Sequence, residues 1–177
     1  MLDIINEQDV IVGQAPIAKA HKEGLLHREV HVWFYTPKSE IIWQGRSKNK
    51  ETFAGLLDAT VGGHASAGQT PLEAAIRETK EETGFVVKPQ DLTLLGTLRA
   101  KSKDTSTNLI NNVIRYIYAY RFEGSVDDLK IEEGEITHFE VWPIEKMFSL
   151  DTEKSRFIAK LLDDENLEIY RKIQQLV

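Results

Sequence analysis

Runs of apolar and β-branched residues, separated by turn residues, alternate along this chain with segments that have helical spacing. The strand-like runs are Leu2–Ile5, Val10–Val12, Val30–Tyr35, Ile41–Gln44, Leu92–Leu98, Val113–Phe122 and Ile136–Trp142. One helix is predicted directly before Gly84, with Leu72, Ala75, Ile76 and Thr79 as its buried stripe. Further helical segments are predicted at Ile17–Lys22, from Pro143 to Met147, and once or twice between Thr152 and Gln175. Strands interleaved with two main helical regions indicate an α/β fold with a mixed sheet between helices.

A glycine-rich stretch, residues 63–71, precedes the helix with the clearest boundaries. Thr70 is expected to cap its N-terminus, with Pro71 at the first helical position and Glu73 completing a capping box. Gly84 is suited to end the helix in a left-handed conformation. The segments on either side are a basic loop, Arg46–Thr52, and an apolar connector, Phe53–Leu57.

The same helix carries an unusual concentration of acidic residues near its C-terminal end. Glu78 and Glu82 are four residues apart, and Glu81 is three residues from Glu78, so the carboxylates share one side. Like charges at this spacing cost about 0.2–0.5 kcal/mol per pair, and acids in a last turn oppose the helix dipole. A bound divalent cation would compensate for this repulsion, because Mg²⁺ prefers carboxylate oxygens. The alternative is a solvated acidic face in which Arg77 forms ordinary surface ion pairs.

The spacing of these residues resembles the Nudix box. Gly63, followed by residues 77–85 with the sequence Arg-Glu-Thr-Lys-Glu-Glu-Thr-Gly-Phe, is similar to the pattern of that superfamily. Gln69 stands where the family has glutamate, and Thr79 stands where it has an aliphatic residue. The resemblance implies an α/β/α sandwich, with Glu78 and Glu82 as ligands of Mg²⁺ or Mn²⁺ and the Gly62 or Gly63 carbonyl nearby. It also implies that Glu81 is a further ligand or a base.

The surroundings of the box resemble one branch of the superfamily, the isopentenyl-diphosphate-isomerase-like proteins. Leu26-His27-Arg28 and the run Leu57-Asp58-Ala59-Thr60-Val61-Gly62-Gly63-His64 carry this likeness. Arg46 and Lys50 fall where the isomerase holds its diphosphate, and two cations near a glycine loop suit a phosphate. The alternative is a solvated basic loop, which is the interpretation we keep for Lys48.

The five histidines divide into two groups. His27 and His64 match two histidines that bind the isomerase's own metal, so a second metal site is one interpretation, and a structural role is the other. His21 is displaced by one residue from a third such position and stays unassigned. His31 and His138 lie in strand-like runs and are expected to be structural. The three tryptophans, Trp33, Trp43 and Trp142, are expected in the core, and stacking on a base is the alternative.

Isomerase chemistry itself is disfavoured by the sequence. Gly62 stands at the position of the isomerase's essential cysteine, and the chain contains no cysteine. A catalytic carboxylate on the long strand would fall near Asn112, whose amide is not a useful acid or base.

Composition limits the remaining classes of function. The chain has 177 residues, 41% of them hydrophobic, and we expect one domain, 1–177, with a core at about 28–148 and a C-terminal helical segment at 152–176. A net charge of −6 gives no overall basic field for nucleic acid. The sequence shows neither a signal peptide nor a run long enough to span a membrane, and the absence of cysteine fits a cytoplasmic protein, either a monomer or a homodimer.

We therefore expect a hydrolase that uses Mg²⁺ or Mn²⁺ to cleave a diphosphate bond in a small molecule, such as a nucleoside diphosphate linked to another group. An additional catalytic glutamate from a later loop is expected among Glu132, Glu133 and Glu135, with Glu135 preferred. The alternative class is a Nudix domain that binds a nucleotide without cleaving it. Such domains usually lack the box glutamates, which this chain keeps.

Overall fold

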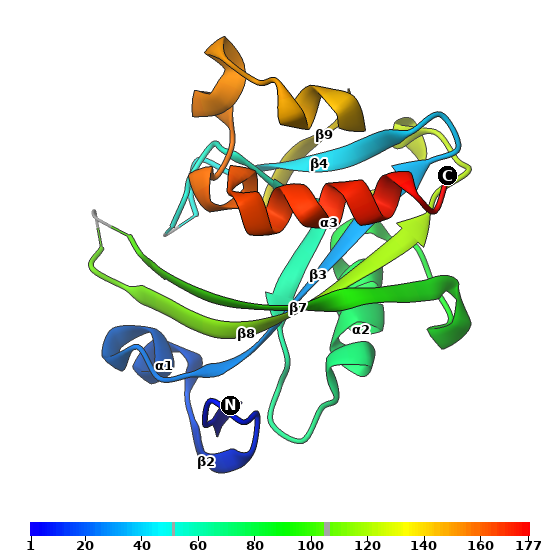
Figure 1. Ribbon diagram of the computed structural model, residues 1–177. Coiled ribbons are helices and arrows are strands. Elements are labelled where there is room, and N and C mark those ends of the chain that lie inside the picture. The colour runs from blue at the N-terminus through cyan, green and yellow to red at the C-terminus, as the bar shows by residue number, and fades with distance from the viewer. Residues whose placement is uncertain (51, 105–106) are drawn as a thin grey trace.

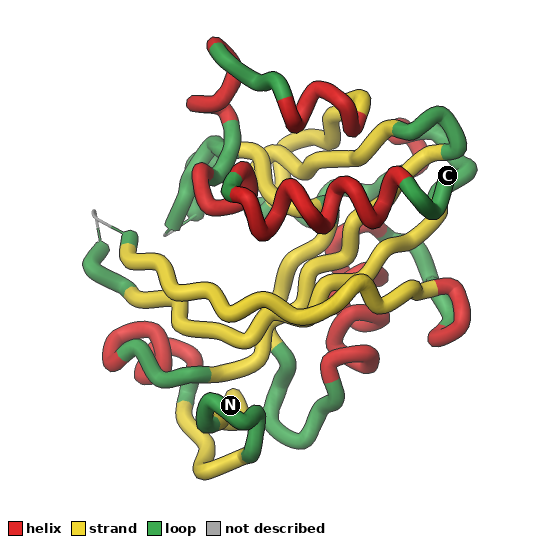
Figure 2. The backbone as a smooth tube through the Cα atoms, in the orientation of Figure 1, coloured by secondary structure: helices red, strands yellow, loops and turns green. Residues whose placement is uncertain are grey.

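The computed structural model describes residues 1–50, 52–104 and 107–177. In these ranges a mixed nine-stranded sheet lies between helices, with α3 crossing one face and α2 covering the other (Figures 1 and 2). This confirms the expected α/β/α sandwich.

The regular elements of the chain follow the predicted order closely. The strands are β1 (Leu2–Ile5), β2 (Ile11–Ala15), β3 (His27–Thr36), β4 (Glu40–Arg46), β5 (Leu57–Ala59), β6 (Val61–His64), β7 (Leu92–Lys103), β8 (Ile110–Arg121) and β9 (Ile136–Pro143). The α-helices are α1 (Ile17–Glu23), α2 (Pro71–Thr83) and α3 (Asp164–Gln174). Short 3₁₀ segments are η1 (Pro89–Asp91), η2 (Val126–Asp128), η3 (Ile144–Phe148), η4 (Thr152–Arg156) and η5 (Ala159–Leu162). None of the described helices combines the length and apolar character needed to cross a membrane.

Strand β3 is the hub of the sheet. It runs parallel to β8 over nine residue pairs, from His27 opposite Val113 to Tyr35 opposite Arg121. Its other edge pairs antiparallel with β6, which places His64 opposite Glu29 and Gly62 opposite His31. The glycine segment is therefore fixed to the central strand rather than free in a loop.

Successive side chains of β3 point to opposite faces of the sheet, so this strand contributes to the hydrophobic cores on both sides. Trp33 and Tyr35 face the α3 side, where Trp33 packs edge-on against Trp43 and Tyr170. Val30, Val32 and Phe34 face the α2 side. Trp33, Trp43 and Trp142 are all buried, as expected.

Several predicted boundaries were wrong. The sequence did not indicate β5 and β6, because Asp58, Gly62 and Gly63 interrupt any strand pattern and these strands form by pairing with β4 and β3. Strand β7 continues to Lys103, so the first part of the expected loop, Lys101–Asn108, is strand. Residues 105 and 106 of that loop, and residue 51 of the basic loop, lie outside the described residues.

Two helical predictions also need correction. Helix α2 buries Ala74, Ala75, Thr79, Glu82 and Thr83, whereas Leu72 and Ile76 are only partly buried. The segment after Pro143, and most of the stretch between Thr152 and Leu162, are 3₁₀ rather than α-helical.

Candidate active site

Helix α2 begins and ends as its sequence predicts. The Thr70 hydroxyl accepts a hydrogen bond from the Glu73 amide, and the Glu73 carboxylate accepts one from the Thr70 amide at 2.8 Å. Gly84 has φ of 74°, a conformation that glycine adopts without strain. These two caps fix where the helix begins and ends, and its buried face, which includes Ala75 and Thr79, turns Glu82 inward.

Glu82 points into the protein, toward strands β4 and β6. Its Oε2 accepts hydrogen bonds of 3.1 Å from both Gln44 Nε2 and the Gly62 amide. Burial raises the pKa of Glu82 well above its usual range, and the neighbouring Glu78 acts in the same direction. A buried carboxylate in this state favours binding of a cation that restores its charged form.

Glu78 lies against the glycine segment. A Cβ atom added to Gly63 would stand 2.2 Å from the Glu78 carboxyl carbon, so only glycine leaves room for this carboxylate. Burial raises the pKa of Glu78, an effect that Arg77 partly opposes. The buried Glu82 carboxylate and the partly buried Glu78 carboxylate thus meet the Gly62–Gly63 backbone.

Arg77 organises the outer side of this cluster. It contacts Glu78 and Glu81 at 2.7 Å each and donates to the His64 carbonyl oxygen at 3.0 Å. Gln69 accepts a long hydrogen bond of 3.4 Å from the same guanidinium. Gln69, which departs from the Nudix pattern, therefore still contacts Arg77. The Glu81 side chain remains about half exposed.

A cavity of about 790 Å³ opens beside the glycine segment, and Gly62 and Gly63 form part of its wall. Arg46 and Lys50 line it, whereas the exposed Lys48 does not. Arg46 donates to Asp58 Oδ2 at 2.8 Å and to the Thr52 carbonyl at 2.9 Å, so its guanidinium is held in place. Lys50 forms an ion pair with Glu135, and burial lowers its pKa, with Arg46 acting in the same direction.

The acidic segment before β9 approaches the site from the other side. Glu135 lines the cavity through its ion pair with Lys50. The negative charge of Glu132 contributes to the raised pKa of both Glu78 and Glu82, so this residue is electrostatically coupled to the box. Glu133 is exposed.

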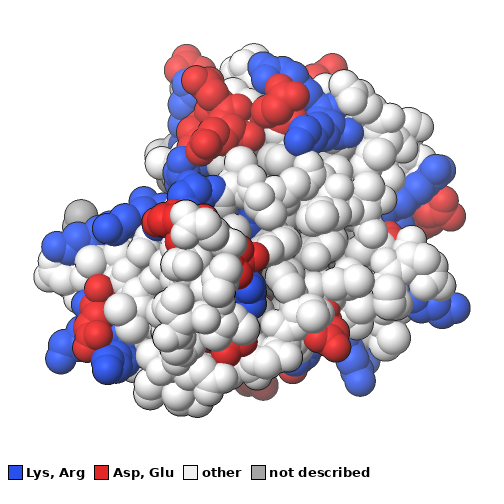
Figure 3. Space-filling view, turned by 60° about the horizontal axis from the view of Figure 1, so that its bottom comes forward, with Lys and Arg blue, Asp and Glu red and all other residues white. Residues whose placement is uncertain are grey.

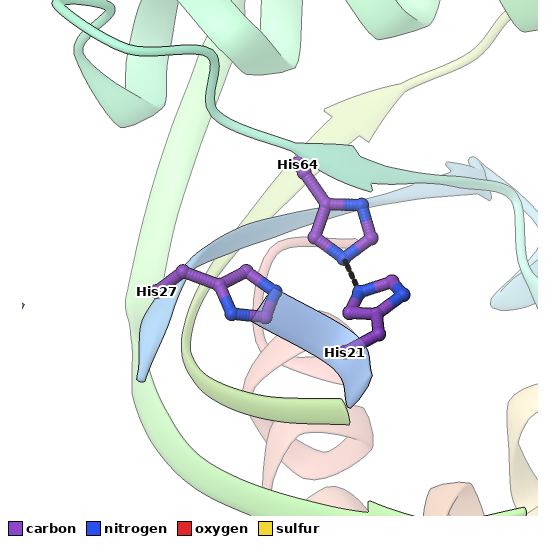
Figure 4. A group of neighbouring side chains, drawn as sticks. All are labelled: His21, His27 and His64. Atoms are coloured by element: carbon purple, nitrogen blue, oxygen red, sulfur yellow. Dashed lines mark hydrogen bonds between the residues drawn. The ribbon is translucent and has the colours of Figure 1, made fainter. Parts of the chain in front are cut away.

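Three histidines point toward one another (Figure 4), and two of them, His21 and His64, line the cavity. His21, His27 and His64 each present a nitrogen within 4.8 Å of the other two, and His21 Nε2 lies 3.3 Å from His64 Nε2. His27 Nδ1 donates to the Leu25 carbonyl oxygen at 2.8 Å, so its buried Nε2 is the basic nitrogen; among the described residues Nε2 has no hydrogen-bond partner. Burial lowers the pKa of His64 to about 4 and also lowers that of His27. His27 and His64 are therefore neutral at pH 7, and three imidazole rings grouped in this way have the chemistry of a nitrogen-donor metal site.

The remaining two histidines differ from each other. His138 is exposed and bonds Glu140 at 2.8 Å on β9. His31, by contrast, is buried in the cavity wall, and burial lowers its pKa to about 4.

The floor of the cavity carries charged residues that sequence reasoning did not single out. Arg115 donates to Glu29 Oε2 at 2.6 Å, and Asn111 donates to Glu29 Oε1 at 2.9 Å. Asn111, not Asn112, is the asparagine that lines the cavity; Asn112 bonds the Gly24 carbonyl and Arg99 instead. A signal was available, because Arg115 interrupts an otherwise apolar strand run.

Figure 3 shows how charged side chains are distributed over one face of the protein. Lysine and arginine side chains lie there mostly toward the edges, next to aspartate and glutamate, and the middle of the face is largely uncharged.

Comparison with known proteins agrees with this geometry. The family model described as the NUDIX domain matches residues 25–164. An uncharacterized Nudix hydrolase from Clostridium acetobutylicum is 26% identical over 138 residues, which cover 76% of this chain and 66% of the relative. An isopentenyl-diphosphate Delta-isomerase from Streptomyces coelicolor is 30% identical over 119 residues, which cover 67% of this chain and 59% of the relative. The chain thus spans about 60 to 66% of the length of these two curated relatives.

A solved structure shows the same fold over nearly the full length. A protein from Deinococcus radiodurans aligns with a TM-score of 0.67 and 23% identity over 97% of each chain.

Proposed function

We propose that this chain, which belongs to the Nudix domain family, hydrolyses the diphosphate bond of an organic diphosphate with the help of Mg²⁺ or Mn²⁺. The observation that carries the proposal is the position of Glu78 and Glu82. Glu82 is buried and Glu78 is partly buried, both have raised pKa values, and each contacts one glycine of the segment that walls the cavity. Hard oxygen donors of this kind fit Mg²⁺ or Mn²⁺.

Glu78 and Glu82, with the Gly62 or Gly63 backbone, would hold the cation. When bound, such an ion neutralises phosphate charge and lowers the pKa of water. Arg46 would donate to the diphosphate oxygens, and Asp58 keeps its guanidinium oriented toward the cavity wall. Lys50 would add a second positive charge once its ion pair with Glu135 opens.

A carboxylate must accept the proton of the attacking water. Glu135 lines the cavity, and release from Lys50 would leave its carboxylate free to take this proton. Glu81 is the second candidate, since only its Oε2 is engaged by Arg77. Glu81→Gln and Glu135→Gln distinguish the two candidates. The variant that lacks the true base should lose most of its activity, and its kcat should no longer fall on the acid side of the pH profile.

The three histidines support a second cation site, distinct from the carboxylate pair. Imidazole nitrogens suit Zn²⁺ or another transition metal better than Mg²⁺, and the buried, unpartnered His27 Nε2 is the donor that needs a ligand. Metal analysis after dialysis, with His27→Gln as the control, tests this site without reference to activity.

The alternatives are an isomerase and a non-catalytic nucleotide sensor. An isomerase would need an acid and a base on a carbon skeleton, but the chain has glycine at position 62 and asparagine at position 112, where the resemblance places these two groups. Release of phosphate or of a nucleoside monophosphate from a panel of nucleotide sugars, dinucleoside polyphosphates and coenzyme diphosphates separates enzyme from sensor. Cleavage that requires Mg²⁺ or Mn²⁺ is expected; tight binding without cleavage by any metal would favour the sensor.

A further inference from the structure

The floor of the cavity is built from two parallel strands that place polar side chains side by side. Glu29 on β3 is directly opposite Arg115 on β8 in the register of the sheet. His31 and Asn111 lie on the same two strands and also line the cavity. On the same face, the next residues along these strands, Trp33 and Ile117, enter the apolar core. The polar set therefore occupies only the part of the face that the cavity reaches.

This floor is electrically balanced. Arg115 and Glu29 form a 2.6 Å ion pair, and their side chains are 9% and 10% exposed. Asn111 occupies the other Glu29 oxygen. A second anion would gain little here, since the carboxylate cancels the guanidinium.

The network nevertheless leaves polar atoms without partners. Within the part of the chain that the structure describes, Arg115 Nη1 and His31 Nδ1 are buried and have no hydrogen-bond partner. Such atoms are costly to leave unpaired. Because both side chains line the cavity, a molecule bound there can supply the missing partner after a small adjustment of the side chains.

Three chemical classes can be compared for the group that lies on this floor. A hydrocarbon chain would leave the donors unpaired and would desolvate an ion pair. An anion would be repelled by the Glu29 carboxylate. A hydroxyl both donates and accepts, so it can serve Arg115, His31 and the remaining lone pairs of Glu29.

We propose that Glu29, His31, Asn111 and Arg115 form a hydroxyl-binding subsite, and that the organic group joined to the diphosphate is a hydroxylated ring such as a sugar. The inference rests on the proposed function only for the diphosphate, which Arg46 and Lys50 would bind in the same cavity. The floor determines specificity. A site built to bind hydroxyls rejects an analogue without them far more strongly than an apolar pocket rejects an added hydroxyl.

The test compares two five-carbon diphosphates of different polarity. Affinities of ribose 5-diphosphate and isopentenyl diphosphate are measured by calorimetry with the full chain in EDTA, where metal-dependent cleavage does not occur. Wild type should bind the ribose compound at least about tenfold more tightly, as one well-paired group can account for. Equal affinities, tighter binding of the hydrocarbon, or no measurable binding of the ribose compound would overturn the proposal.

Two variants assign the preference to the floor. Asn111→Leu keeps the side-chain size, and the double variant Glu29→Gln/Arg115→Met removes both charges so that neither is left buried alone. Each should bring the ratio of the two affinities close to one. Tyr116→Phe, which removes a hydroxyl from the opposite face of β8, is the control and should keep the wild-type ratio. An unchanged ratio in Asn111→Leu contradicts the proposal even if the double variant does not fold.

Hydrolysis assays on the same proteins keep the two ideas separate. A clear ribose preference without any hydrolysis would refute the proposed function and leave the subsite standing. Hydrolysis together with equal affinities for the two diphosphates would support the proposed function and overturn the subsite.

Discussion

Replacing Glu82 by glutamine should separate the catalytic role of this side chain from its structural one. Both hydrogen bonds to Glu82 Oε2, from Gln44 and the Gly62 amide, can be accepted by a glutamine carbonyl. The fold should therefore survive the change. At a pH above the raised pKa of Glu82, the substitution removes a buried negative charge, which relieves about 0.2–0.5 kcal/mol of repulsion from Glu78 together with the desolvation cost of that charge.

The expected magnitudes follow from these contacts. Without metal and above the Glu82 pKa, Glu82→Gln should melt about 0.4–2 °C above wild type from the relieved repulsion alone, since 1 kcal/mol corresponds to roughly 2–4 °C for a domain of this size. With metal at about 100 times its Kd, wild type should gain about 2.7 kcal/mol, or roughly 5–11 °C. The variant should lose most of that gain and about 10²–10³-fold in kcat.

The assay is thermal unfolding in EDTA and across a Mn²⁺ titration, together with kcat on the best substrate. Glu168→Gln on the exposed face of α3 is the matched control and should behave like wild type in both. A Glu82→Gln protein that melts several degrees lower in EDTA would show that the carboxylate is structural. Retained activity with an undiminished metal shift would remove Glu82 from the site.

Three further changes test neighbouring parts of the account. Arg46→Ala should lower kcat/KM for every diphosphate about ten- to a hundredfold, because a charge-assisted contact is lost. Lys48→Ala is the control and should have little effect. If the two variants have the same kcat/KM, the basic loop has no binding role. Gly63→Ala should lower kcat while keeping the melting temperature within a few degrees, since its Cβ displaces only the flexible end of Glu78, and unchanged kinetics would refute the close approach. Burial holds the pKa of His31 at about 4 in the folded state, against 6.5 when unfolded, so the free energy of unfolding should fall as pH drops from 6.5 to 4. His31→Gln should remove about 3 kcal/mol of that fall, as measured by urea titrations at each pH. The same pH dependence in wild type and variant would contradict this prediction.

Local sequence rules were sufficient for helix α2 and its caps. Thr70, Glu73 and Gly84 act on residues within one turn of themselves, so their roles can be read without knowing the rest of the fold. The same is true of the crowded carboxylates at Glu78 and Glu82, whose spacing alone places them on one side.

Contacts between distant strands could not be predicted in this way. The bond between Glu29 and Arg115 joins residues 86 positions apart, and it depends on the parallel register of β3 and β8. The sequence leaves His21 unassigned, because it is displaced by one residue from the third metal-binding position. In the fold, helix α1 brings its ring next to His64. Strand β6 was missed for a similar reason, since its glycines form a strand only by pairing with β3.

The central claim is that water attacks a diphosphate phosphorus atom at the site formed by Glu78, Glu82 and the cavity beside them. The most direct measurement is ³¹P NMR of the products formed in H₂¹⁸O from the best cleaved diphosphate, with Mg²⁺ or Mn²⁺ and with EDTA. We expect two phosphate-ester products or a phosphate ester and free phosphate, with ¹⁸O in one of the two phosphorus groups and no reaction in EDTA. Label in the organic hydroxyl group instead, or cleavage that proceeds unchanged in EDTA, would contradict the account.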